Sequence, residues 1–315
     1  MNKFGIKNEY RKGGESEVKN RELRFRIVDG LLIALMIVPL AAGMVIKVLT
    51  SPVSEGISIA GANIFFTVPM PLQNLQITEA QVNSWLVLLF ILGLCLFMTH
   101  GMAQGIKCRR HLIAEWVVEK TDGLVNENMG DFFMAFSPFV GAIMALSACS
   151  SLLTLIGLYP PTSDLNVVAG WAILVFILIT NYKLKGGLGN YLRGYLDPIF
   201  IMAPMNVISE LATPVAMSFR HYGNVLSGAV IAALVAGGLE GLSSILLGWL
   251  PGVLGEIPFL KIGIPAILSI YFDIFSGCMQ AFIFAMLTMM YVAGGFPEDL
   301  WRERQEKKKL KKNNA

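Results

Sequence analysis

The sequence predicts an all-α polytopic membrane protein with about six membrane segments. Of its 315 residues, 55% are hydrophobic and only 15% are charged, and the charges gather at the two ends and in a few short loops. One helical crossing needs roughly 20 predominantly apolar residues, and the chain has several runs of that length. The expected crossings are residues 27–49, 84–103, 132–158, 165–182, 198–239 and 262–296.

The first crossing, residues 27–49, follows a long polar leader. This arrangement favours a retained signal anchor over a cleaved signal peptide. Basic residues are dense in the leader and return in alternate loops and in the tail, whereas the intervening loops are poor in them. By the positive-inside rule, both termini are predicted to be cytoplasmic. We therefore expect a basic leader (1–26), a single membrane domain (27–296) and a basic tail (297–315).

A segment between the second and third crossings, residues 109–131, mixes charges with Ile113, Trp116, Val117 and Leu124. This mixture predicts an amphipathic helix on the cytoplasmic membrane surface. A solvated loop with one helical turn is the alternative.

The last two crossings are too long to stand upright. A helix of 42 residues, the length of 198–239, would reach roughly 63 Å, whereas the hydrocarbon core is about 30 Å thick. The sequence predicts either two long, tilted, antiparallel helices or helices broken near Pro204, Pro214 and Pro265.

Polar residues recur along these two segments at steps of three and four, which places each set on one helical face. Arg220 lies near the middle of the fifth segment, where a guanidinium is tolerated only beside an anion or in a wet cavity. Polar residues of this kind often join helices to one another. An acid on each side of a central cation favours ion handling instead. The fifth segment carries Asn206, Glu210, Thr213, Met217, Arg220, Asn224 and Ser227, and the sixth carries Ser269, Asp273, Ser276 and Gln280.

Other classes of function have little support in the residues. The four cysteines and three histidines share no ligand spacing, so we expect no metal site and no cofactor. No phosphate loop or pair of nucleophile and base appears outside the membrane, which argues against a catalytic enzyme. A net charge of +3, segregated into the ends and loops, does not indicate nucleic-acid binding.

Two motifs resemble subunit a of the bacterial F-type ATP synthase. PMNVISELATPVAMSFRHYGNVLSG resembles the arginine-bearing helix of that family, and MQAFIFAMLTMMYV resembles its last helix. PTSDLN, IAEW, NMGDFF and KLKGGLGNYL resemble further segments, so the resemblance extends over residues 80–293. The leader and the first crossing resemble only some bacterial members.

The resemblance implies a stator subunit in the bacterial inner membrane that passes protons or Na⁺ to and from a ring of c subunits through two offset half-channels. It also implies peripheral-stalk b subunits as partners. By motif position, Arg220 is the arginine that faces the ring, Gln280 is its partner and Asn224 lies one turn away. Asp273 is the expected outer-channel acid and Glu210, with Asn206, the inner-channel candidate; Ser227 and Ser276 belong to the polar stripes.

The chain departs from the family pattern at three positions. Ala229 stands where many members carry Glu or His, Asp273 where some carry His, and Asn206 where some carry Glu. His221 points about 100° away from Arg220 and is predicted to be structural. Asp164 and Asn166 are predicted either to line the entrance or to cap the fourth crossing.

Two other functions fit the same residues. A self-contained secondary transporter or channel could also use a membrane arginine, although such folds usually contain internal repeats and this sequence has no second arginine segment. The second alternative function is a structural scaffold, in which the charges pair with partner helices.

Overall fold

The computed structural model describes residues 3–50, 61–71, 74–102, 109–185, 187–196, 200–247, 263, 267–268 and 270–296. Within these residues, six helical segments are long and apolar enough to cross a membrane. The predicted all-α polytopic class is confirmed, with one small hairpin in addition. The candidate spans are Leu23–Leu49, Glu79–Thr99, Asp131–Ile156, Leu165–Leu184, Ala203–Leu246 and Ile270–Gly295.

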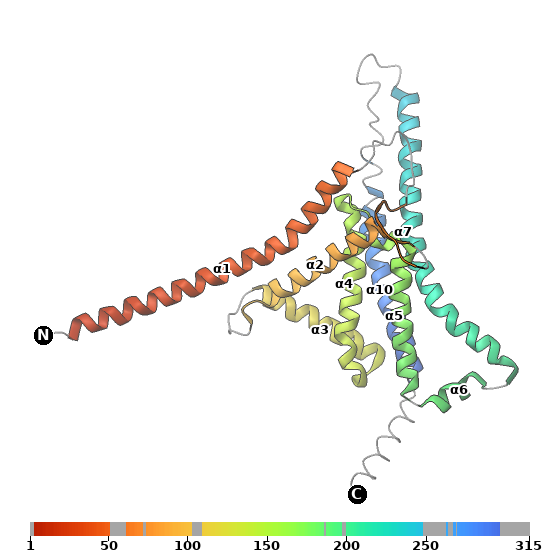
Figure 1. The fold of residues 1–315 in the computed structure, drawn as a ribbon, viewed down its shortest axis with the longest axis horizontal. Coiled ribbons are helices and arrows are strands. Elements are labelled where there is room, and N and C mark those ends of the chain that lie inside the picture. The colour runs from red at the N-terminus through yellow and green to blue at the C-terminus, as the bar shows by residue number, and fades with distance from the viewer. Residues whose placement is uncertain are drawn as a thin grey trace, which may run out of the picture. The chain divides into compact units, whose positions relative to one another are not determined.

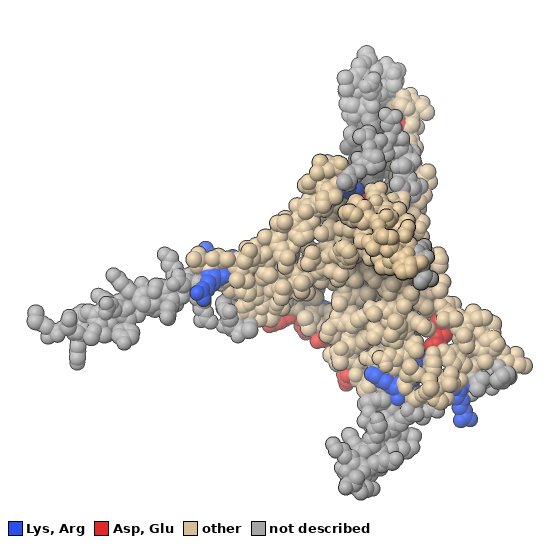
Figure 2. Space-filling model, viewed as in Figure 1, with Lys and Arg blue, Asp and Glu red and all other residues tan. Residues whose placement is uncertain are grey.

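The chain forms two compact units, which we describe separately: residues 1–51 with 85–120, and residues 52–84 with 121–315. The single membrane domain expected from the sequence stays a prediction. On the face drawn in Figure 2, the described surface is mostly uncharged, as expected for helices that contact lipid.

The first unit contains helix α1 (Lys3–Thr50), most of α2 (Glu79–Thr99) and the first half of α3 (Arg109–Met129). Helix α1 starts within the predicted leader, so the leader is helical in its described part. Gly93 allows α1 and α2 to approach closely, since a Cβ atom there would lie 2.7 Å from Cγ of Met36.

A charged cluster joins the three helices of this unit. Asp29 of α1 lies 2.8 Å from Nδ1 of His100, and its other oxygen lies 2.9 Å from Arg110. The Arg110 guanidinium also lies over the rings of Phe25 and Phe97, at 5.0 and 4.8 Å from their centroids. The carboxylate inside the first crossing is therefore neutralised within its own unit, as a charge at membrane depth requires.

The second unit contains the remaining elements (Figure 1). Strands β1 and β2 form an antiparallel hairpin that the sequence analysis did not predict. Helix α4 is extended by the 3₁₀ turns η2 and η3, and α10 by the π-helical turn η6. The bounds are β1 Ile64–Val68, β2 Leu75–Thr78, η2 Asp131–Phe136, α4 Ser137–Leu152, η3 Leu153–Ile156, η4 Pro161–Ser163, α5 Leu165–Leu184, α6 Leu188–Leu196, η5 Phe200–Met202, α7 Ala203–Leu247, η6 Ile270–Ser276 and α10 Gly277–Gly295.

The core of the second unit lies where α10 packs against α4 and α5, and where α5 packs against α7. Gly277 permits a close contact between α10 and α4, because a Cβ atom there would lie 2.7 Å from Cβ of Ser151. The buried side chains are mainly aliphatic and aromatic, and they include Val140, Val175, Met217, Phe284 and Met289.

Helix α7 is continuous over 45 residues and contains Pro214. The predicted break at Pro214 is therefore wrong, although α7 changes direction along its length (Figure 1), and a proline that removes one helical hydrogen bond gives a local cause for bending. Pro204 lies in the first turn, where proline is tolerated, so α7 starts at Ala203. The helix runs past the predicted end at Leu239. Pro265 and most of residues 262–269 lie outside the described residues.

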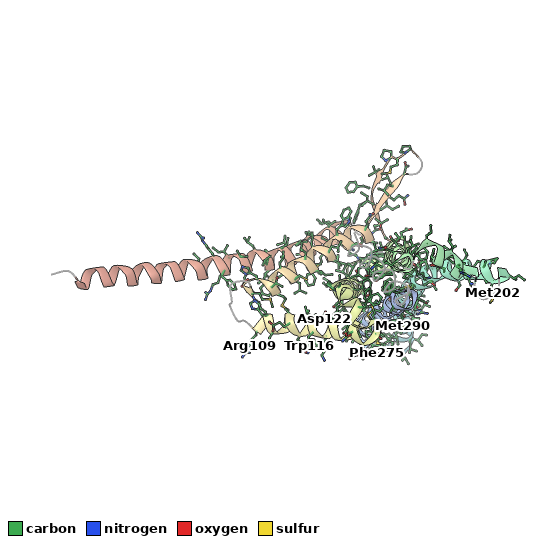
Figure 3. All side chains as sticks on the ribbon, turned by 90° about the horizontal axis from the view of Figure 1, so that it is seen from below. Arg109, Trp116, Asp122, Met202, Phe275 and Met290 are labelled. Carbon is green, nitrogen blue, oxygen red and sulfur yellow. The ribbon has the colours of Figure 1, made fainter. Side chains whose placement is uncertain are left out.

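The predicted surface segment is helical, since α3 extends over Arg109–Met129. Ile113, Trp116 and Val117 are exposed, as a membrane-surface helix requires. The solvated-loop alternative is therefore wrong, and Figure 3 shows the helix with Arg109 and Trp116 labelled.

Candidate functional site

Arg220 projects from α7 with its side chain exposed. Among the described residues, none forms a hydrogen bond or an ion pair with its guanidinium. A free guanidinium on the surface of a membrane helix is costly unless an anion or water from outside the described chain reaches it. Arg220 thus lies on the exposed surface of α7.

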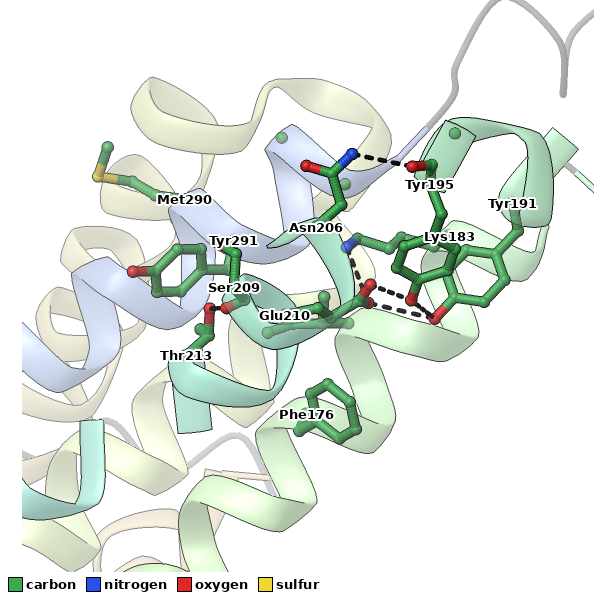
Figure 4. A pocket seen from close by; sticks show the side chains of 14 residues that line it. Phe176, Lys183, Tyr191, Tyr195, Asn206, Ser209, Glu210, Thr213, Met290 and Tyr291 are labelled. Carbon is green, nitrogen blue, oxygen red and sulfur yellow. Dashed lines mark hydrogen bonds and ion pairs between the residues drawn. The ribbon is translucent and has the colours of Figure 1, made fainter. Parts of the chain in front are cut away.

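A cavity of about 540 Å³ lies beside the first turns of α7. It lies between the carboxyl-terminal ends of α5 and α10 and helix α6 (Figure 4). Two predicted site residues, Asn206 and Glu210, line it together. The other lining residues include Phe176, Lys183, Tyr191, Tyr195, Ser209, Thr213 and Tyr291.

Glu210 is the most highly connected group in this cavity. Lys183 Nζ lies 2.9 Å from one carboxylate oxygen, to which the Tyr191 hydroxyl also donates at 3.2 Å. The Tyr195 hydroxyl donates to the other oxygen, and Asn206 donates to the Tyr195 carbonyl oxygen at 2.9 Å. Burial and the hydrogen bond to Glu210 raise the pKa of Tyr195, so this hydroxyl remains a donor.

A second, much smaller cavity of about 20 Å³ lies farther along α7, enough for about one water molecule. It lies where α7 meets the carboxyl-terminal end of α4 and the start of the last helix. Three predicted site residues, Asn224, Asp273 and Ser276, line it together. The two cavities also show that α7 and α10 are antiparallel, because early residues of α7 meet late residues of α10 and the reverse.

The structure thus sorts most of the predicted residues into two groups separated by Arg220 along α7. Gln280 is buried, with 3% of its surface exposed, and Ser227 is exposed; neither lines these two cavities. The polar stripe of α7 is not uniform, since Met217 lies in the core while Arg220 is exposed.

His221 has the structural role that the sequence analysis predicted. It is fully buried, and Nε2 lies 3.3 Å from the Ser147 hydroxyl. Its ring packs edge-to-face against Trp171 and Phe284. Asp164 caps α5, because its side chain accepts a hydrogen bond from the Asn166 backbone N–H at 2.9 Å. The capping alternative is therefore confirmed for Asp164.

Lys183, Tyr191 and Tyr195 are site residues that were not predicted from the sequence. Lys183 is one of several basic residues near a membrane boundary, Tyr191 lies in the glycine-rich segment KLKGGLGNYL, and Tyr195 follows it. Their spacing of four residues within α6 was the available signal, because it puts both hydroxyls on one face of a helix.

Comparison with known proteins decides the family. The family model described as ATP synthase A chain matches residues 81–293. The chain belongs to this family. It is therefore a membrane-sector stator subunit of an F-type ATP synthase, multi-pass, and part of a complex with other subunits.

Several curated relatives within the ATP synthase A chain family are similar to the chain. The ATP synthase subunit a of Acidothermus cellulolyticus is 32% identical over 214 residues, which cover 64% of this chain and 71% of the relative. The ATP synthase subunit a 1 of Crocosphaera subtropica is 27% identical, over 71% of this chain and 89% of the relative. The ATP synthase subunit a of Propionigenium modestum, described as sodium ion specific, is 25% identical over 75% of this chain and 85% of the relative.

Proposed function

We propose that this subunit provides two offset half-channels that deliver ions to, and collect them from, the carboxylates of a c-subunit ring, with Arg220 separating the two paths. One observation carries the proposal: an exposed guanidinium, unpaired within the described residues, lies along α7 between two cavities that contain different acids. The two cavities share no lining residue, as two separate half-channels require.

The charge of Arg220 accounts for the separation. A nearby cation lowers the pKa of a carboxylate, so a ring acid that passes Arg220 is ionised and has already released its ion. A fixed positive charge also repels a proton or Na⁺ that would pass directly between the cavities. Since one charge that crosses 100 mV is worth about 2.3 kcal/mol, any such leak would waste the free energy that drives rotation.

Within this proposal, the larger cavity is the inner half-channel, with Glu210 and Asn206 as its polar groups. The smaller cavity belongs to the outer half-channel, with Asp273, Asn224 and Ser276. Lys183 and the two tyrosines line the larger cavity, and Lys183 belongs to the basic loop that the positive-inside rule assigns to the cytoplasm. Both termini are then cytoplasmic.

The remaining predicted residues have roles that depend on the ring. We assign Gln280 as the partner of Arg220 on α10 and Ser227 as a polar residue on the same exposed side of α7 as Arg220. The subunit itself has no catalytic role, and a peripheral stalk of b subunits would hold it against rotation. ATP chemistry then belongs to other subunits of the complex.

Reconstitution of the chain by itself tests this function against that of a self-contained transporter. We expect vesicles that contain only the purified chain to show no proton or Na⁺ flux above empty vesicles, because in this proposal each half-channel leads only to the ring carboxylates and not to the opposite membrane surface. Vesicles with the complete complex should pump on addition of ATP. The measurement is the quenching of a pH-sensitive dye, together with uptake of radioactive Na⁺. Flux through the chain alone, at the rate of the complex, would support the transporter and contradict the proposal.

A further inference from the structure

The β1–β2 hairpin has two chemically different faces. Residues opposite each other in an antiparallel ladder point to the same face, and successive residues alternate. Phe66 lies opposite Ile77 and Val68 opposite Leu75, so these four apolar side chains share one face. Thr67 lies opposite Gln76, and this pair belongs to the other face.

The apolar face of the hairpin is largely exposed. Phe66 is 69% exposed, Leu75 is 45% exposed and Val68 is 39% exposed. Residues 61–78 contain no Lys, Arg, Asp or Glu. A two-stranded hairpin is marginally stable in water, and a contiguous exposed apolar face generally marks a contact with membrane or protein.

The base of the hairpin is fixed at the end of a membrane crossing. The Thr78 hydroxyl donates to Asp164, which is the N-cap of α5, at 3.4 Å. Asn83 donates to the Tyr159 carbonyl oxygen at 2.8 Å, and the Asn63 amide donates to Glu79 at 2.9 Å. These bonds place the hairpin at the level where α5 begins, which is the surface of the membrane that α5 crosses.

The direction in which the hairpin projects is consistent with a location at the membrane surface. In Figure 1, α4 and α5 run roughly up the page, and Figure 3 is viewed along that direction. In Figure 3, the hairpin projects sideways from the helices of its unit, not along them. A hairpin that leaves a crossing sideways lies along the membrane surface.

We propose that the apolar face of this hairpin lies in the headgroup region of the leaflet at which α5 begins, and that its occupant is phospholipid. The absence of formal charge, an aromatic side chain at the most exposed apolar position and the depth fixed by Asp164 all match an interfacial element. The Thr67 and Gln76 face then meets water. This inference rests on the membrane crossing of α5 and is independent of the half-channels.

Site-specific photocrosslinking tests the inference. In the complete complex, reconstituted in vesicles of phosphatidylethanolamine and phosphatidylglycerol, Phe66 or Gln76 is replaced by p-benzoylphenylalanine and irradiated. Mass spectrometry of the chain should show phospholipid adducts at position 66 at least about tenfold above those at position 76, because the two positions point to opposite faces of the pleat. Position 76 is the matched control, in the same hairpin and at the same depth.

Three outcomes would overturn the inference: a protein subunit crosslinked at position 66, equal lipid adducts at the two positions, or no lipid adduct at position 66. If the variant at position 66 does not assemble, replacement of Leu75 provides the same test, because Leu75 shares its face. ATP-driven pumping by each variant, measured before irradiation, identifies the assembled complexes.

Discussion

Arg220→Ala is expected to lower ATP-driven ion pumping by about 100-fold or more, since removal of one preorganised electrostatic group commonly has an effect of this size. Because the Arg220 side chain is exposed and forms no interaction with the described residues, its loss should leave the folded subunit and its assembly intact. The measurement is dye quenching in vesicles, together with the yield of assembled complex. Arg109→Ala, which removes another exposed arginine, should pump normally.

Arg220→Lys separates charge from geometry. A lysine retains a cation but lacks the planar fork, and it can lose its proton when it is desolvated, so we expect it to restore less than about a tenth of the pumping. Normal coupled pumping by Arg220→Ala would contradict the role of the arginine. Normal assembly of the Arg220→Ala complex together with lost pumping would exclude the scaffold function.

Glu210→Gln is expected to lower ATP-driven pumping by about tenfold, because it removes the carboxylate from the larger cavity, and general acids and bases typically contribute 10²-fold or more where they act alone. The same change leaves Lys183 without its ion partner and weakens two tyrosine hydrogen bonds. An unpaired group in such a site costs about 1–3 kcal/mol, so the thermal stability of the subunit should also fall.

A double-mutant cycle with Lys183→Met isolates the ion pair. Since Lys183 and Glu210 are in direct contact, the two changes should be less than additive in stability. Lys185→Met is the matched control, because Lys185 lies over the Tyr182 ring at 3.8 Å and does not line the cavity. Fully additive effects, or a Glu210→Gln complex that pumps normally, would show that Glu210 is not part of the ion path.

The crossings could be predicted because each is a long apolar run between polar loops, and all six appear among the described residues. Their ends could not, because helices continue into polar sequence when tertiary contacts allow it. Helix α1 begins at Lys3 inside the predicted leader, and α7 continues to Leu247. The hairpin was missed because β1 and β2 are short and are stabilised by each other and by Asp164, a residue distant in the sequence.

Some residues of the candidate site could likewise be predicted from the sequence, and others could not. Helical spacing and family resemblance predicted which residues of α7 and of the last helix belong together, and the cavities group Asn206 with Glu210 and Asn224 with Asp273. Lys183 lies 27 positions before Glu210, and no local periodicity connects the two. The packing of α5 against α7 brings them together, and only the three-dimensional structure reveals it.

Thiol accessibility measured from each side of the membrane distinguishes two separate half-channels from one continuous path. In a chain with its four native cysteines replaced, Asn206→Cys and Ser276→Cys would each be treated in sealed, oriented vesicles with a membrane-impermeant reagent applied to one side. We expect the thiol at position 206 to react only from the cytoplasmic side and the thiol at position 276 only from the opposite side. Reaction of both from the same side, or of either from both sides, would contradict two separate half-channels.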